Sequence, residues 1–515
     1  MANSEESRPI LQHLSDISLS ESSTYGSTGI NKHRTVSSST ISNKSEALRK
    51  NLVARKSTLG PSIPLSLSWE NLNVSANLKK GLLKKTKPGE PTEKQILKNV
   101  NGFIEAGQLV ALMGASGAGK TTLLNTLTNR NVRSMNVSGS IKVNGDDIGR
   151  AITMISAYVQ QEDLFIPTLT VREHLRFQAL LRLPKDMTWE AKSVRVEEVI
   201  FELGLRKCAN SRIGSSMGRR GISGGEQKRL AFASEVITNP PILFCDEPTT
   251  GLDSFMAESV VRVLLRLASR GKTVVCTIHQ PASEVYLMFD RVLLLAEGRT
   301  AFLGSTQEAL GFFKKSGYPC PSDYNPADFY VHTLAIVPGN EAGCRKTVND
   351  ICDAYEVSNF AKKVNDQINE ESAGSRLPMA NSTYKRYKVN AFVQFICLLW
   401  RSTLNNYRDN QVATVKFVQK FILGLFVGLI YFDTQITEIG IRDINGALFF
   451  MTMEFSMPAI FGVLNAIPQD FPVLVREHHN GMYSVLSYYT AKIISSLPVY
   501  SLDGVLFIAI SYFMI

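Results

Sequence analysis

The sequence predicts an α/β domain with a parallel sheet, followed by an all-α region that contains about three membrane-spanning helices. Short apolar runs alternate with helical patterns across residues 65–335, which is typical of α/β domains. Three apolar segments of about 20 residues follow residue 411, and each is long enough to cross a bilayer. With 44% hydrophobic and 20% charged residues over 515 positions, the chain is not uniformly disordered.

Charge and cysteine content exclude few functions. The formal net charge of +10 suits nucleic acid or an anionic membrane surface and decides for neither. The seven cysteines are scattered without CxxC pairs, so we expect reduced thiols rather than a zinc site or a disulfide framework. The first thirty residues contain no apolar run, so no cleavable signal peptide is expected.

Composition divides the chain into five stretches. Residues 1–64 are rich in serine and are predicted to be a disordered tail. Residues 65–335 form the α/β domain, residues 336–387 a polar linker, and residues 388–411 a connecting helix. Residues 412–515 form a partial transmembrane domain, with spans at about 412–432, 445–467 and 493–515.

Turn residues bound the predicted elements of the α/β domain. The apolar runs read as strands are 110–113, 141–143, 242–245, 273–277 and 291–295. Helical patterns between them include residues 190–204 and 254–270.

Positive charge predicts the orientation in the membrane. The segment before the first span carries Lys385, Arg386, Lys388, Arg401 and Arg408. The loop after it is mostly acidic, with Asp433, Glu438, Arg442 and Asp443, and basic residues return at Arg476 and Lys492. The α/β domain is therefore expected in the cytoplasm. Two acids inside the spans, Glu454 and Asp503, are candidates for a cavity, a helix end or a pairing role.

A glycine-rich run lies between the strand at 110–113 and the following helix. It matches the phosphate-loop pattern GxxxxGK[ST] and consists of Gly114, Ala115, Ser116, Gly117, Ala118, Gly119, Lys120, Thr121 and Thr122. Glycines let backbone N–H groups turn toward phosphates, and the helix N-terminus adds favourable partial charge. We expect Lys120 to hold the β- and γ-phosphates and Thr121 to coordinate Mg²⁺. This predicts an α/β P-loop NTPase domain.

The strand at 242–245 ends in two acids, Asp246 and Glu247. Asp246 is placed to hold Mg²⁺ through water, and Glu247 to polarise the water that attacks the γ-phosphate. Without a phosphate loop, the alternative of two solvated acids at a strand end would be favoured.

The segment from Gly221 to Arg229 contains Ser223-Gly224-Gly225-Glu226 and resembles the LSGGQ signature of ATP-binding cassette proteins. The other family motifs occur in order: Gln161 before the signature, then Asp246-Glu247, Asp253 and His279 after it. The chain is thus identified as a member of that family, with a cassette domain at 65–335.

The resemblance implies a role for each matching residue. Gln161 would contact Mg²⁺ and link to the membrane part, Asp253 would cross a dimer interface, and His279 would sense the γ-phosphate. ATP held by a partner's phosphate loop would be covered by the signature residues Ser223, Gly224, Gly225 and Glu226. Trp69 is the nearest aromatic candidate for stacking on adenine, and a core position is the alternative.

A cassette before the membrane region resembles the G subfamily of half-transporters, as do residues 324–329. Residues 246–254, 276–281 and 464–483 look most like the White, Scarlet and Brown eye-pigment transporters, and nearest to Scarlet. This implies a heterodimer with a White-like partner that moves tryptophan-derived pigment precursors, across a pigment-granule or plasma membrane. Those relatives have six spans, so a chain ending in its third is expected to be an incomplete half.

Two alternatives to a pigment transporter remain. A G-type exporter of lipids or sterols shares every ATPase residue, and only the membrane cavity could separate the two. A soluble cassette ATPase would lack the apolar spans. The expected partners are a second half-transporter, the lipid bilayer and a small-molecule substrate, with ATP and Mg²⁺ as cofactors and no nucleic acid.

Overall fold

The computed structural model describes residues 64–77, 93–132, 135–214, 221–373, 387–432, 434–435 and 437–514. The predicted N-terminal tail, apart from Pro64, lies outside the described residues. All seven cysteines are described, and all are free thiols.

A six-stranded sheet forms the centre of the cassette, in the order β10-β9-β3-β8-β7-β6. Its strands are β3 (Leu109–Met113), β6 (Ser156–Val159), β7 (Ile242–Cys245), β8 (Thr273–Thr277), β9 (Arg291–Ala296) and β10 (Arg299–Ser305). The strands from β9 to β6 are parallel, and β10 pairs antiparallel with β9. Every residue of β3, β7 and β8 is buried, as expected where helices cover both faces of a parallel sheet.

A second sheet is antiparallel, in the order β2-β1-β4-β5. Its strands are β1 (Leu67–Asn77), β2 (Glu93–Ile104), β4 (Met135–Val143) and β5 (Asp146–Asp147). The strand expected at 141–143 is the end of β4 and does not belong to the parallel sheet, because β4 pairs antiparallel with β1. Trp69 in β1 is 1% exposed and packs over Gly102 of β2, so it is a core residue.

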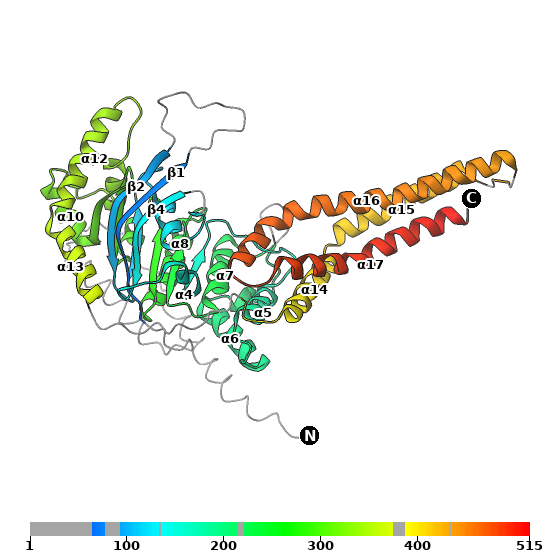
Figure 1. Ribbon diagram of the computed structural model, residues 1–515, viewed down its shortest axis with the longest axis horizontal. Helices are drawn as coiled ribbons and strands as arrows, with labels where there is room; N and C mark the ends of the chain where they lie inside the picture. The colour runs from blue at the N-terminus through cyan, green and yellow to red at the C-terminus, as the bar shows by residue number, and fades with distance from the viewer. Residues whose placement is uncertain are drawn as a thin grey trace, which may run out of the picture. The chain divides into compact units, whose positions relative to one another are not determined.

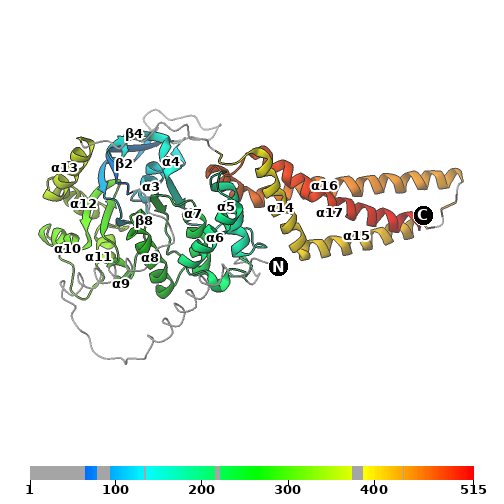
Figure 2. The same ribbon diagram turned by 90° about the horizontal axis from the view of Figure 1, so that it is seen from below.

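The helices of the cassette lie on and around these sheets (Figure 1). The segments at 190–204 and 254–270 are helical, as predicted, and correspond to α6 and α8. The helices α5, α6 and α7 pack against one another, and α7 packs on β6 (Figure 2). The helices from α3 to α9 are α3 (Lys120–Leu127), α4 (Ile152–Ile155), α5 (Val171–Arg182), α6 (Trp189–Glu202), α7 (Gly224–Val236), α8 (Ser254–Ala268) and α9 (Ser283–Tyr286). Short 3₁₀ turns lie at Gly149–Ala151 and Arg206–Cys208.

The expectation of a polar linker at 336–387 is wrong for residues 341–373. They form α12 (Glu341–Glu356) and α13 (Asn359–Ala373), which follow α10 (Thr306–Lys315) and α11 (Pro326–Thr333). The two helices pack on β10 and β2. The apolar stripe of α12 is narrow but regular: Val348, Ile351, Cys352 and Tyr355 recur at helical spacing and join the cassette core. Because the segment as a whole is polar, its sequence did not reveal this apolar stripe. Residues 374–386 lie outside the described set.

The described residues from 387 to 514 contain four helices: α14 (Ala391–Arg408), α15 (Asn410–Ile430), α16 (Glu438–His479) and α17 (Val485–Tyr512). The long helices α15, α16 and α17 run side by side (Figures 1 and 2). The Nζ of Lys420 in α15 donates to Oε1 of Glu454 in α16 over 2.5 Å, so Glu454 has a pairing role. Among the described residues, α17 alone is long and apolar enough to cross a membrane, and 417–430 is a shorter apolar stretch.

Gly102→Ala should destabilise the cassette. An added Cβ would lie 2.2 Å from Cζ2 of Trp69, and overpacking of this kind costs about 1–3 kcal/mol. The indole is 1% exposed, so any shift would displace its neighbours in the core. The midpoint of thermal unfolding of the purified protein measures the effect. Gly311→Ala in α10 is the control, because its Cβ would meet nothing within 4 Å. Equal midpoints for Gly102→Ala and wild type would contradict this packing.

Candidate functional site

The predicted ATPase residues follow four neighbouring parallel strands. The phosphate loop follows β3, Gln161 follows β6, Asp246 and Glu247 follow β7, and His279 follows β8. Because the carboxyl ends of parallel strands meet at one edge of a sheet, these segments lie along the same edge. His279 is exposed there.

The phosphate loop is a narrow turn built around a buried ammonium group. Gly114 has φ +150°, and a Cβ there would lie 2.2 Å from the carbonyl oxygen of Leu295, so only glycine fits. Lys120 Nζ donates to the carbonyl oxygens of Gly114 and Ala115 over 2.8 and 3.0 Å. Burial lowers the pKa of Lys120, and the carboxylates of Glu247 and Asp246 oppose this shift. The loop therefore presents a cation in a backbone cradle, which suits a polyphosphate.

Two hydroxyl groups fix the carboxylate of Asp246. Thr277 Oγ1 donates to Oδ1 over 2.7 Å, and the hydroxyl of Tyr158 donates to Oδ2 over 3.0 Å. Burial and the neighbouring carboxylate raise the pKa of Tyr158, so the phenol keeps its proton and remains a donor. Together with the hydroxyl of Thr121 and the amide of Gln161, this oxygen set fits a hard cation such as Mg²⁺.

The structure brings Glu247 and Gln161 together. Gln161 Nε2 donates to Oε2 of Glu247 over 2.6 Å, and Thr250 Oγ1 donates to the same oxygen over 2.9 Å. The backbone N–H of Glu247 donates to Thr277 Oγ1 over 2.7 Å. Glu247 also has φ +45°, a backbone conformation that is uncommon for residues other than glycine and clusters at functional sites.

The signature segment stands apart from the phosphate loop of its own chain. Ser223 is the N-cap of α7 and forms a capping box with Glu226. Asp253 is the N-cap of α8, where Oδ1 accepts from the N–H of Met256 over 2.8 Å. Within the part of the chain that the structure describes, no hydrogen bond or ion pair links Ser223–Glu226 to residues 114–122. In this structure these residues cap helices.

Sequence reasoning missed four residues that support the site. Tyr158 and Thr277 stood inside the segments that carry Gln161 and His279, but nothing in the sequence showed that both point at Asp246. Thr250 was likewise not assigned. Lys228 of α7 donates to the carbonyl oxygen of Gln161 and pairs with Asp163 at 3.2 Å, which ties the signature helix to the loop after β6.

This fold and this sheet edge define an ATP-binding cassette ATPase. Residues 97–250 match the ABC transporter family model, and residues 393–515 and 279–352 match two ABC-2 type transporter models. The ATPase is therefore coupled to a membrane transport domain. The match at 393–515 argues against a soluble cassette ATPase.

The chain belongs to the G subfamily of ATP-binding cassette half-transporters. Protein white of Drosophila melanogaster is 41% identical over 467 residues, which cover 88% of this chain and 68% of that protein. Protein scarlet of the same species is 42% identical over 426 residues, covering 82% of this chain and 64% of that protein. The broad substrate specificity transporter ABCG2 of Sus scrofa is 35% identical over 472 residues, covering 87% and 70%.

Thr277→Val should slow ATP hydrolysis and raise the Mg²⁺ concentration needed for it. Valine keeps the shape but removes the hydroxyl that holds both Asp246 and the backbone of Glu247. Loss of such a supporting partner typically costs about 10–100-fold in metal affinity or activity. The ATPase rate measured over a range of Mg²⁺ concentrations gives both the maximal rate and the Mg²⁺ requirement. Thr277→Ser retains the hydroxyl and should stay near wild type, so equal losses in both variants would refute a hydrogen-bonding role.

Proposed function

We propose that this chain is one half of a dimeric transporter that uses Mg²⁺-dependent ATP hydrolysis to move a small organic molecule, a tryptophan-derived or related pigment precursor. One observation carries the ATPase part: Lys120, Asp246 and Glu247 lie along one sheet edge, and hydroxyl or amide donors orient both carboxylates. The substrate class rests on the similarity to proteins white and scarlet.

Each group at this edge has a distinct task in the proposed reaction. Lys120 and the backbone N–H groups of the loop bind the β- and γ-phosphates, and Thr121, Asp246 and Gln161 would hold Mg²⁺, which supplies positive charge to the phosphate oxygens. Glu247 orients and polarises the attacking water. His279, exposed at the end of β8, would sense the γ-phosphate.

A second half-transporter completes the site. The signature residues Ser223, Gly224, Gly225 and Glu226 would cover ATP on the partner's phosphate loop, and Asp253 would cross the interface between the halves. This proposal rests on the family resemblance of the signature, whose Ser223 caps α7 in this chain. A White-like partner is the proposed second half, in a pigment-granule or plasma membrane.

Glu247→Gln should leave ATP binding intact and slow hydrolysis by about 10²–10⁴-fold, since a positioned acid–base group contributes that much. The loss corresponds to roughly 3–5 kcal/mol of barrier. ATP affinity and turnover are measured in a purified dimer whose other site is already inactive. Lys120→Ala should instead weaken ATP binding itself, because it deletes the charge on the phosphates. Wild-type turnover in Glu247→Gln would show that another group activates the water.

Co-purification from native membranes should recover a related but different half-transporter. Vesicles containing the recovered pair should accumulate radiolabelled tryptophan or its oxidised derivatives in the presence of ATP, and should not move cholesterol. Cholesterol movement without tryptophan uptake would instead identify a sterol exporter. Recovery solely as a homodimer with full transport would overturn the partner assignment.

A further inference from the structure

The turn between α16 and α17 holds Asn480 in a defined position. Gly481 has φ +67°, its N–H donates to the carbonyl of His478, and the N–H of Met482 donates to that of Glu477. These two bonds form a Schellman motif that ends α16 at Asn480. Glu477 in turn accepts two hydrogen bonds from the buried Arg401 of α14, at 2.7 and 2.8 Å. These bonds therefore fix the backbone from which the side chain of Asn480 projects.

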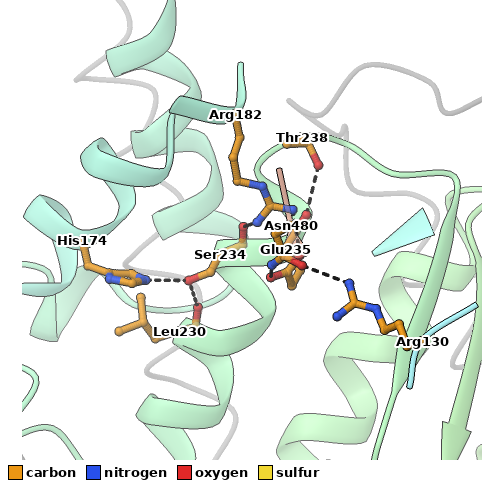
Figure 3. Close-up of polar contacts among 8 residues, drawn as sticks. All are labelled: Arg130, His174, Arg182, Leu230, Ser234, Glu235, Thr238 and Asn480. Carbon is orange, nitrogen blue, oxygen red and sulfur yellow. Dashed lines mark hydrogen bonds and ion pairs between the residues drawn. The ribbon is translucent and has the colours of Figure 1, made fainter. Parts of the chain in front are cut away.

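The amide of Asn480 has a cation on one side and an anion on the other (Figure 3). Its Oδ1 accepts from Arg130 over 2.9 Å, and its Nδ2 donates to Oε1 of Glu235 over 3.0 Å. The oxygen faces the guanidinium and the nitrogen faces the carboxylate, so the charges of the partners fix the orientation of the amide. Arg130 and Glu235 are 8% and 7% exposed, so water screens these contacts little.

Arg130 connects Asn480 to the Asp246 carboxylate through a series of side-chain contacts. It lies in the turn that ends α3, the helix whose first residue is Lys120, and a second Schellman motif through Asn129 fixes its backbone. The guanidinium carbon lies 4.8 Å from the centre of the Tyr158 ring, within cation–π range. The hydroxyl of that ring is the donor to Oδ2 of Asp246. Three side-chain contacts thus separate Asn480 from the carboxylate.

Glu235 leads from Asn480 to the signature helix. It lies near the carboxyl end of α7, whose N-cap is Ser223, and it also pairs with Arg182 of α5 at 2.7 Å. One amide therefore contacts both Arg130, in the turn after α3, and Glu235 of the signature helix α7.

We propose that Asn480 is a positioning residue for ATP hydrolysis. It sets the geometry of the Asp246 carboxylate through Arg130 and Tyr158, and at the same time it fixes the place of the signature helix through Glu235. This inference rests on the proposed function. Movement of the turn between α16 and α17 would then change both halves of the ATPase through one side chain.

An exchange of amide and carboxylate tests the proposal. Asn480→Asp puts a carboxylate against Glu235, and repulsion should lower Mg·ATP turnover by about 5- to 20-fold, within the usual range of coupling between sites. The double variant Asn480→Asp/Glu235→Gln restores every bond. The new amide at position 235 would donate to the new carboxylate at position 480, and both Arg130 and Arg182 would keep an acceptor. Its turnover should return to within about twofold of wild type.

Turnover and the Mg²⁺ concentration for half-maximal rate are measured in the full-length protein with its native partner, in lipid nanodiscs. Asn480→Asp should raise that Mg²⁺ concentration. In a Tyr158→Phe background, which keeps the ring under Arg130 but removes the hydroxyl on Asp246, Asn480→Asp should cause no further rise. Ser234→Ala is the control: it removes the 3.0 Å contact between Ser234 and His174, next to Glu235 on the same helix, and should leave the Mg²⁺ requirement unchanged.

The outcomes separate this inference from the proposed function. If the wild-type dimer shows no ATP hydrolysis, the proposed function fails. If wild type hydrolyses ATP but Asn480→Asp matches it, or the exchange variant is no better than Asn480→Asp, the positioning role is wrong. Additive Mg²⁺ effects of Tyr158→Phe and Asn480→Asp would likewise overturn the route through the tyrosine.

Discussion

The register between β7 and β8 is the constraint on which the ATPase site depends. Cys245 and Cys276 are partners in adjacent parallel strands, so the next residues along, Asp246 and Thr277, emerge side by side at the sheet edge. One hydroxyl can then donate to the Asp246 carboxylate and accept from the backbone of Glu247. A slip of one residue would turn the side chains of β8 to the opposite face of the sheet and leave a buried carboxylate short of a donor, which is costly.

Motifs of contiguous residues could be predicted from the sequence, whereas contacts between side chains that are distant in the sequence could not. The phosphate loop needs particular residues at fixed spacing, so Gly114–Lys120 and the adjoining strand were predictable, as was the strand that ends in Asp246. The donors Tyr158 and Thr277 come from other strands, and only strand order places them. The apolar stripe of α12 was missed for a related reason. Val348 and Tyr355 are buried because α12 packs on β10, a strand that is distant in the sequence.

The C-terminal helices show the same difference between local features, which could be predicted, and distant contacts, which could not. Segment length and charge predicted long apolar helices and marked Glu454 as unusual, but the partner Lys420 lies on another helix, 34 residues away. The second predicted span and the polar segment after it form the single helix α16. Along this helix the chain passes from Glu454 to Glu477, which pairs with Arg401 of α14, and its C-cap Asn480 contacts Arg130 and Glu235 of the cassette. Hydropathy marks where lipid could lie, and it does not mark where a helix ends.

The distribution of thiols makes this protein suited to site-selective labelling. Cys245 and Cys276 adjoin the catalytic edge but are fully buried, and burial raises their pKa values, so both resist alkylating reagents. Cys320 and Cys344 are partly accessible, and both lie later in the cassette sequence than those strands. A fluorophore or spin label attached there would follow the cassette through its cycle while the native thiols beside Asp246 stay unmodified, without first removing every cysteine.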